Sequence, residues 1–433
     1  MQTNKVIKNA TWIIVCRVMQ AVLSMIISML TARYLGPSNY GIINYASSIV
    51  AFVVPIMQLG FRNTLVQEIV KNSEKEGEIL GTALVFSLIS AIFCVVGVTA
   101  FVSIANRGEV DTIIVCCLYS FNLVFQALEM TQYWYQAKLL SKYTSIVSLG
   151  AYGVVSIYKI FLLITGKSIY WFAISQALDY CIISILLLII YQKIGEKKIS
   201  FSVKTGKNML STSRHYIVSS MMVTVFGHIG SIILKFLMDD AAVGFYTASV
   251  SCAGMTNFIF AAIVDSARPT ILESKTKNQS AFEKNVVRLY SIVIYVSLAQ
   301  GIVLSVFANL IVHVLYGNAF EATVAPLRIM AWYTTFSYLG TVRNVWILAE
   351  EKQKYLWIIN FLGACSNIIL NLILIPVIGI VGAALASVIT QIFTNIIVSY
   401  IIKSIRINNR LMFTALNPKY LMEMLRVVMR KCK

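Results

Sequence analysis

Long apolar runs alternate with short polar connectors from the N-terminus to about residue 402. A bilayer core needs about 20 apolar residues for each helix that crosses it. The run that follows MQTNKVIKNATW is too long for a signal-peptide core and lacks an A-x-A-like cleavage site, so we interpret it as an uncleaved first helix. The runs predict an all-α integral membrane protein with twelve transmembrane helices, at residues 10–33, 41–61, 80–105, 112–135, 143–165, 168–192, 209–237, 243–268, 287–316, 325–349, 355–376 and 379–402.

The composition supports a chain that faces lipid. Hydrophobic residues make up 58% of the 433 residues and charged residues 12%, whereas a soluble domain carries about 25% charge. The net charge of +18 does not indicate nucleic-acid binding, because the Lys and Arg residues are confined to short gaps between apolar runs. The eight cysteines have no CxxC spacing and lie almost entirely in apolar runs, which argues against a disulfide framework or a zinc site.

The Lys and Arg residues also predict an orientation. Twenty-nine of them fall in the N-terminal segment, the connectors on the same side and the tail, and five fall on the opposite side. The excess places both termini in the cytoplasm, which requires an even number of spans. Residues 404–433 form a basic cytoplasmic tail, in which YLMEMLRVVMRK has amphipathic helical spacing. This tail is either a contact with the anionic leaflet or a simple stop-transfer segment.

Two pairs of segments indicate an internal repeat. YLGPSNYGIINYAS, from Tyr34, matches FLMDDAAVGFYTASV, from Phe236, with one residue inserted. KYTSIVSLGA, from Lys142, matches KYLWIINFLGA, from Lys354, and both pairs lie in register. We therefore predict a six-plus-six duplication about an axis along the membrane normal, with an N-terminal six-helix lobe at 1–200 and a C-terminal six-helix lobe at 201–403.

Four segments carry a resemblance to a known family, and they lie in the right order along essentially the whole chain. They are ARYLGPSNYGIINYASSIVAF, ILKFLMDDAAVGFYTAS, HVLYGNAFEATVAPLRIM and NIILNLILIPVIGIVGAALASVITQ. The chain resembles the polysaccharide flippases (Wzx-type) of the MATE-like MOP exporter superfamily. The resemblance implies a V-shaped pair of lobes and transport of oligosaccharide repeat units of O-antigen or capsule, linked to undecaprenyl pyrophosphate, across the bacterial cytoplasmic membrane. The partners it suggests are the lipid-linked oligosaccharide and the polymerase and glycosyltransferases of the same pathway. One departure is Lys235, where many relatives carry an acidic residue.

Ionisable residues inside spans are rare and costly, so each is a functional candidate. We predict that the lumen between the lobes is cationic and holds the pyrophosphate, because Arg offers two charge-assisted hydrogen bonds and Lys a point charge. The predicted substrate-binding residues are Arg17, Lys159, Arg214, Arg268 and Arg343. Arg17 and Lys159 lie deepest in their spans. The other three are close enough to the cytoplasmic face for their side chains to reach headgroups instead.

The acidic residues Asp179, Asp265 and Glu129 are candidates for coupling to H⁺ or Na⁺. Each has a structural alternative, since Asp179 could pair with Lys159 and Asp265 with Arg268. His228, among apolar neighbours, is read as a packed histidine, and Lys235 as an interfacial residue. Aromatic and amide residues that could contact sugars, or merely fill the core or the lipid belt, are Tyr133, Trp134, Tyr135, Tyr152, Tyr158, Asn257 and Trp346.

Nothing in the sequence indicates an enzyme, a cofactor or a metal site. It contains no GxxxxGK[ST], HExxH or GxSxG motif. The alternatives to a flippase are an ion-coupled small-molecule or multidrug exporter on the same fold, and a membrane polysaccharide polymerase or ligase. The outer connectors are too short for the catalytic loop that a polymerase would need, which leaves the pair Glu109 and Asp111 as its only acidic candidate there.

Overall fold

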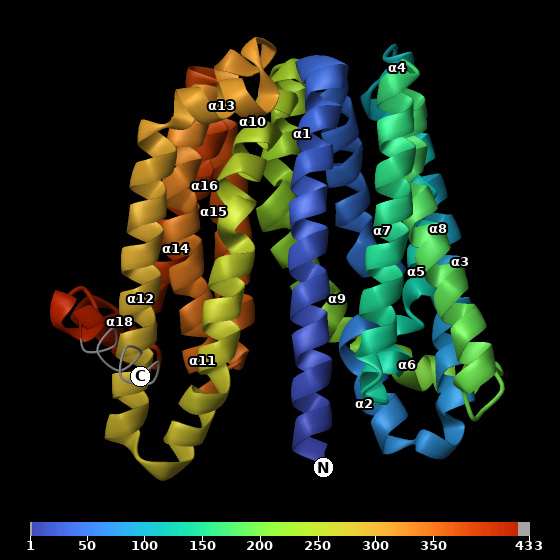
Figure 1. Ribbon diagram of the computed structural model, residues 1–433, viewed down its shortest axis with the longest axis horizontal. Coiled ribbons are helices and arrows are strands. Elements are labelled where there is room, and N and C mark those ends of the chain that lie inside the picture. The colour runs from blue at the N-terminus through green and yellow to red at the C-terminus, as the bar shows by residue number, and fades with distance from the viewer. Residues whose placement is uncertain (1, 423–433) are drawn as a thin grey trace. The chain divides into compact units, whose positions relative to one another are not determined.

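The computed structural model describes residues 2–422, which are helical almost throughout and contain no β-strand. The chain divides into two compact units, Met1–Ile232 (unit 1) and Ile233–Lys433 (unit 2), both drawn in Figure 1. The division falls inside one helix, α9, whereas the sequence analysis begins the second lobe at 201. The N-terminal half of α9 belongs with unit 1 because it packs there, with the Thr64 and Ser213 hydroxyls 2.6 Å apart.

Unit 1 begins with a helix that folds back on itself. Its elements are α1 (Gln2–Met57), α2 (Phe61–Lys71), η1 (Ser73–Lys75), α3 (Glu76–Ala105), α4 (Val110–Ser120), α5 (Asn122–Glu129), α6 (Gln132–Ala137), α7 (Ser141–Ile164), α8 (Ile169–Ile194) and α9 (Val203–Leu237). Within α1, Gly36 has φ +72° and ψ 173°, a conformation that residues with a Cβ rarely adopt. Pro37 follows it, so this join separates the first two predicted spans.

A buried aromatic cluster packs one end of unit 1. The Trp134 ring meets Tyr135 and Tyr191 edge-on, with centroids 5.0 and 4.8 Å apart. Beside it the linker that precedes α9 lies directly on α3, where a Cβ on Gly81 would stand 2.2 Å from the Ser200 carbonyl oxygen. Glycine is required at that position because only a bare backbone admits so close an approach.

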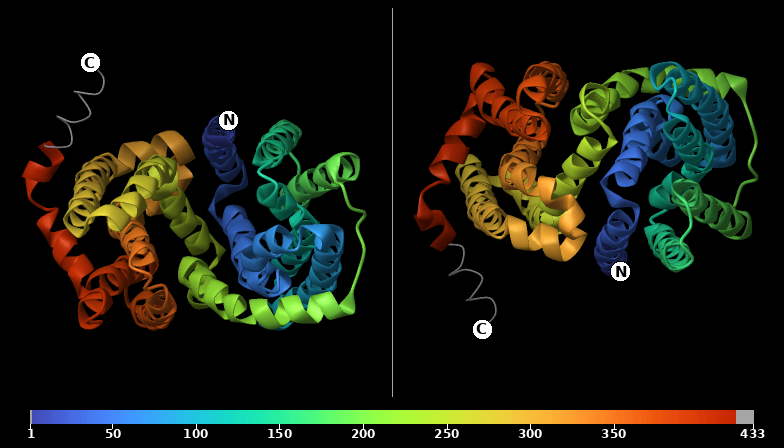
Figure 2. Two further views of the ribbon diagram at one scale, coloured as in Figure 1. Left: turned by 90° about the horizontal axis from the view of Figure 1, so that it is seen from below. Right: turned by 90° about the horizontal axis from the view of Figure 1, so that it is seen from above.

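Unit 2 is a second bundle around its own core. Its elements are α10 (Asp240–Ala253), η2 (Gly254–Thr256), α11 (Asn257–Lys277), α12 (Gln279–Val306), α13 (Ala308–Tyr316), η3 (Asn318–Thr323), α14 (Val324–Ala349), α15 (Lys354–Ile378), α16 (Ile380–Ile392), η4 (Phe393–Val398), α17 (Ser399–Ile401) and α18 (Arg406–Thr414). The central helix α14 packs against α10, α12 and α16. End-on views show the helices of each unit gathered as a bundle (Figure 2).

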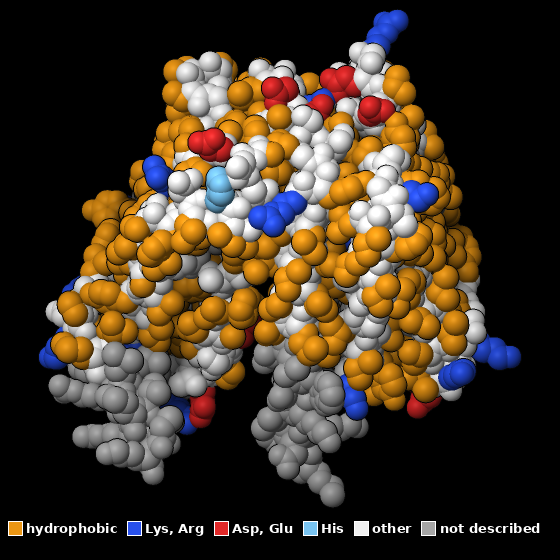
Figure 3. Space-filling view, turned by 45° about the horizontal axis from the view of Figure 1, so that its top comes forward, with side chains coloured by type: hydrophobic (Ala, Val, Ile, Leu, Met, Phe, Trp, Pro, Cys, Tyr) orange, Lys and Arg blue, Asp and Glu red, His pale blue; other side chains and the backbone are white. Residues whose placement is uncertain are grey.

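The span count agrees with the sequence. The described residues hold ten helices long and apolar enough to cross a membrane. One of them, Val18–Met57, contains the Gly36 turn and so provides two spans. The twelfth span is α14, which is not one of those ten helices but whose 26 residues extend about 39 Å. Hydrophobic side chains cover most of the face drawn in Figure 3, as expected for contact with lipid. The twelve-helix, all-α membrane fold is thus confirmed.

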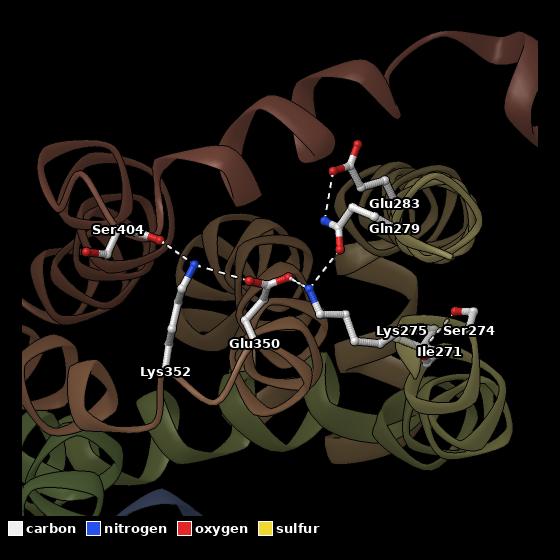
Figure 4. A network of polar contacts seen from close by, with 8 residues as sticks. All are labelled: Ile271, Ser274, Lys275, Gln279, Glu283, Glu350, Lys352 and Ser404. Carbon is white, nitrogen blue, oxygen red and sulfur yellow. Dashed lines mark hydrogen bonds and ion pairs between the residues drawn. The ribbon is translucent and has the colours of Figure 1, made fainter. Parts of the chain in front are cut away.

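A charged network ties the ends of several unit 2 helices together (Figure 4). Glu350, just after α14, is paired with Lys275 of α11 and lies 3.3 Å from the Lys352 ammonium. Lys352 donates in turn to the Ser404 carbonyl oxygen over 2.9 Å. Burial by itself would raise the pKa of Glu350. The hydrogen bonds and positive charges of the two lysines outweigh burial and hold its pKa below the ordinary value.

The expected tail is partly structured. Residues 406–414 form α18, whose Leu411 and Met412 belong to the unit 2 core. The tail therefore begins as a packed helix rather than as a segment separate from the lobe. Of the amphipathic stretch YLMEMLRVVMRK, residues 423–431 lie outside the described residues.

Candidate functional site

A polar cavity of about 730 Å³ lies within unit 1. Residues from α1, α2, α4, α5, α6, α8 and α9 contribute to it, all of them before Ile232. Its lining contains five glutamines, and the polar side chains that surround it are Ser47, Gln58, Arg62, Tyr119, Asn122, Gln126, Glu129, Gln132, Tyr133, Gln136, Gln176, Tyr180, Thr224 and His228. Such a concentration of uncharged amides and hydroxyls on membrane helices indicates a water-filled or ligand-filled space.

Helical spacing brings these groups to one side. Asn122, Gln126 and Glu129 follow at i, i+4 and i+7 along α5, which places them on one face of that helix. Gln176 and Tyr180 are four residues apart on α8, which packs against α5. The Gln126 amide nitrogen donates to the Asn122 side-chain oxygen over 3.3 Å, so this row is internally hydrogen-bonded.

The amide residues of this cavity were not identified from the sequence. Of the residues that the sequence singles out, Glu129, Tyr133 and His228 line the cavity, whereas none of its amide side chains is among them. The signal was present, because Gln126 and Gln176 each have a polar neighbour four residues away on the same helix. His228, which is expected to be a packed histidine, is half-buried and also lines the cavity, so its role stays a prediction.

Basic and acidic side chains occur together in and beside the cavity. Arg62 and Glu129 both line it and attract one another. Asp179 of α8 lies 8% exposed nearby, where its carboxylate repels Glu129 and attracts Lys159 of α7. Among the described residues, the Asp179 Oδ1 atom has no hydrogen-bond partner. Two of these four ionisable side chains are basic and two are acidic, so basic residues do not stand alone in this part of unit 1.

The other predicted basic residues lie in varied environments. Arg214 is exposed on α9. Arg268 forms an ion pair with Asp265 at 3.3 Å, and both side chains are about half exposed, so the alternative of an ion pair between them is confirmed. The side chain of Arg17 lies outside the described residues. Contact of these residues with a substrate stays a prediction, as does ion coupling through the three acidic candidates.

Arg343 and Lys235 are buried in unit 2. Arg343 is 4% exposed and donates to the Thr394 carbonyl oxygen over 3.0 Å and to the Asn344 side chain over 3.2 Å. Lys235 is 7% exposed and lies 2.7 Å from the Asp240 carboxylate. A neighbouring carboxylate allows the ammonium group of Lys235 to be buried, and its interfacial position stays a prediction.

The predicted sugar-contacting residues also separate by environment. Tyr133 lines the cavity, as expected of a sugar-binding aromatic residue. Trp134, Tyr135 and Trp346 are packed in the hydrophobic cores. Asn257 accepts a hydrogen bond from the Tyr338 hydroxyl. Among the side chains that the structure describes, no group of three or more His, Cys, Asp or Glu residues could hold a metal ion.

Several known proteins are similar to this chain in sequence or in fold. The profile of a family described as polysaccharide biosynthesis protein matches residues 6–275, more than half of the chain. The capsular polysaccharide biosynthesis protein CapF of Staphylococcus aureus is 22% identical, over 92% of this chain and 100% of its own. A putative O-antigen transporter of Escherichia coli is 21% identical, over 82% and 86%. An uncharacterized membrane protein of Methanocaldococcus jannaschii is 25% identical over 51% of this chain. The chain spans only 46% of the length of that protein.

Two solved structures have the same fold. A multidrug resistance transporter of the MATE family in the MOP superfamily gives a TM-score of 0.69 at 12% identity, covering 92% of this chain and 95% of that one. The lipid II flippase MurJ also gives 0.69, at 15% identity, covering 95% and 92%. At these identities the likeness establishes the fold: an all-α membrane protein of the MOP type.

Proposed function

Because the chain belongs to the polysaccharide biosynthesis protein family, we propose that it is a flippase that moves a lipid-linked oligosaccharide across a membrane. The names of its relatives support transport: one is a putative O-antigen transporter, and a protein of the same fold is a lipid II flippase. The specific cargo we propose is an oligosaccharide on undecaprenyl pyrophosphate. The proposed location is the bacterial cytoplasmic membrane, with both termini in the cytoplasm.

The observation that carries this proposal is the amide-rich cavity of unit 1. Glutamine and asparagine side chains present both donors and acceptors, which matches the paired donor and acceptor character of sugar hydroxyls. Tyr119, Tyr133 and Tyr180 add ring faces and hydroxyl groups to the same wall. Its volume of about 730 Å³ falls within the range of roughly 300–1,000 Å³ typical of small-molecule sites.

The physical problem in such transport is the polar head. A hydroxyl moved into hydrocarbon without a partner costs roughly 2–7 kcal/mol, so a bare oligosaccharide cannot cross. We propose that the cavity replaces the hydrogen bonds to water while an alternating-access movement changes the side to which the cavity opens. The process breaks and forms no covalent bond, so no catalytic residue is required.

The diphosphate needs positive charge, and Arg62 supplies it at this cavity. Its guanidinium can form two parallel hydrogen bonds to phosphate oxygens. The residues predicted from the sequence, Lys159 foremost among those in unit 1, remain candidates for the same role in a cationic lumen. Glu129 and Asp179 remain candidates for coupling to H⁺ or Na⁺.

A multidrug exporter is the second candidate function. The observation in its favour is Glu129, a carboxylate in a tyrosine-lined cavity, since cationic drugs suit carboxylates and aromatic rings. A membrane polymerase has no comparable feature in its favour.

Transport by the full chain in liposomes tests the proposal. Vesicles loaded with the lipid-linked oligosaccharide on one leaflet are assayed for glycan that becomes accessible to a glycosidase on the other. Gln126→Ala with Gln176→Ala removes two neutral hydrogen-bonding groups, worth about 1–3 kcal/mol together, so transport should fall roughly 5- to 150-fold. Gln192→Ala, at an exposed position near the end of α8, is the matched control. An unchanged glycan rate with altered tolerance of cationic drugs would favour the exporter instead.

A further inference from the structure

A second pocket, of about 570 Å³, lies within unit 2 between α12 and α18. Both helices line it with residues spaced i, i+3, i+4 and i+7, so each presents one face to it. The residues from α12 are Ser280, Glu283, Lys284 and Val287, and those from α18 are Ile407, Arg410, Leu411 and Thr414. Lys419 and Tyr420 complete the lining.

The position of α18 is fixed by two tyrosines of α12. The Tyr290 hydroxyl donates to the Asn408 side-chain oxygen over 3.0 Å, and the Tyr295 hydroxyl donates to the Leu416 carbonyl oxygen over 2.6 Å. Leu411 and Met412 are buried in the unit 2 core. The pocket therefore has a fixed wall on both sides.

The pocket combines positive charge with an apolar floor. Lys284, Arg410 and Lys419 are exposed at it, against the single carboxylate of Glu283. That carboxylate accepts a hydrogen bond from Gln279 over 3.0 Å (Figure 4). The floor contains the buried side chains of Val287 and Leu411. A ligand with an anionic group next to an apolar part would match both features.

The depth of the pocket along α12 is that of a membrane interface. The 28 residues of α12 extend about 42 Å, which is longer than a hydrocarbon core of about 30 Å. No Asp, Glu, Lys or Arg occurs between Arg288 and Val306, a stretch of about 27 Å. The pocket precedes this uncharged stretch, at the level where lipid headgroups lie.

The outer face of α18 supports the same depth. Phe413, which is not among the α18 residues that line the pocket, and Leu416, just after that helix, are about half exposed, although both are large and apolar. Arg406 and Arg410 are exposed on the same short helix. A helix with apolar and basic exposed residues side by side is typical of a membrane surface, where the apolar side chains enter the lipid and the basic ones meet phosphate.

We propose that the pocket between α12 and α18 binds the phosphate headgroup of an anionic phospholipid. Lys284, Arg410 and Lys419 would contact the phosphate, while the start of the acyl chains would lie against Ile407 and Leu411. A free phosphate shares the charge but not the apolar part, so the exposed apolar side chains favour the lipid. The proposal does not depend on what the protein transports.

Lipid binding to the delipidated full chain in detergent tests the site. Bound phosphatidylglycerol is counted by native mass spectrometry, and the melting temperature is followed during titration with phosphatidylglycerol, phosphatidylcholine or inorganic phosphate. Each basic residue near an anionic lipid contributes roughly fivefold, so Lys284→Gln, Arg410→Gln and Lys419→Gln together should weaken phosphatidylglycerol binding on the order of 100-fold. Lys193→Gln, Lys204→Gln and Lys207→Gln, at exposed positions of unit 1, remove the same charge as a control.

The expected result is tight binding of phosphatidylglycerol to the wild type and to the control, and weak binding to the pocket variant. A variant with Lys284→Arg, Arg410→Lys and Lys419→Arg should retain binding, which separates charge from folding. Equal binding by the pocket variant and the control would overturn the proposal. So would stabilisation by millimolar inorganic phosphate that matches that of phosphatidylglycerol, since the site would then accept a soluble anion.

Discussion

The ion pair between Lys138 and Glu76 should stabilise the end of unit 1 next to the polar cavity. Loss of Lys138 should destabilise the unit more than loss of the Glu76 charge. Glu76 stands in the first turn of α3 and is fully buried, and the Lys138 ammonium lies 2.7 Å from its carboxylate. The Lys138 side chain is 31% exposed, so it retains access to water. Lys138 directly follows α6, which contributes Gln132 and Gln136 to the cavity.

The two halves of the pair should therefore differ when removed. Lys138→Met leaves a buried carboxylate without its partner, which typically costs about 3–5 kcal/mol. The N-terminus of α3 offsets up to about 1 kcal/mol of this, so the expected loss is about 2–4 kcal/mol. Glu76→Gln leaves a lysine that can turn to water, and the loss should stay below about 1 kcal/mol, as for exposed pairs.

Thermal unfolding of the full chain in detergent measures the difference. For a unit of this size, 1 kcal/mol shifts the melting temperature by about 2–4 °C, so Lys138→Met should lower it by roughly 4–16 °C. Lys142→Met, which removes a charge at the start of α7, is the control. Equal shifts in melting temperature for Lys138→Met and Glu76→Gln would refute the reasoning, because they would mean that leaving the buried Glu76 carboxylate without its partner costs no extra free energy.

Two further predictions concern close packing and pH. Gly81→Ala should destabilise unit 1 by at least about 1–3 kcal/mol, because its Cβ would stand 2.2 Å from a backbone oxygen. Gly97→Ala on the same helix is the control: its Cβ meets no atom within 4 Å, so it should be neutral or stabilise by up to about 1 kcal/mol. Equal falls in melting temperature for the two variants would contradict this prediction. The lowered pKa of Glu350 means that its ion pair with Lys275 stabilises the fold above the unfolded pKa of about 4.3 and that this contribution is lost as the pH falls through the lower folded value. The melting temperature of the wild type should therefore fall more steeply than that of Glu350→Gln below about pH 5, and parallel curves would exclude the effect.

The sequence was sufficient for the spans because lipid imposes a simple pattern. Each helix needs a long apolar run, and the Gly36–Pro37 pair shows where the first two spans separate. The matched segments from Lys142 and Lys354 also lie at equivalent places, at the starts of α7 and α15. These features depend on local composition, which a single sequence contains in full.

The candidate site was harder to predict because most of its polar residues are uncharged. A search for ionisable groups selects Glu129 but passes over Gln58 and Gln176, which lie far apart in sequence and meet in the folded unit. Amides are tolerated in many helices, so one glutamine carries little information. Only their spacing along α5 and α8 together would have indicated a shared wall.

Arg343 shows that a charge inside a span does not reveal its own partners. The sequence placed it among the substrate-binding residues, yet its guanidinium donates to the Thr394 carbonyl oxygen within the unit 2 core. That carbonyl lies in η4, a π-helical segment, where the wider turn changes the usual hydrogen-bonding pattern and offers a backbone oxygen to a side chain. A single sequence does not reveal a π-helical turn. The backbone oxygen that accepts a hydrogen bond from buried Arg343 is therefore not visible in the sequence, and contact of Arg343 with a substrate stays a prediction.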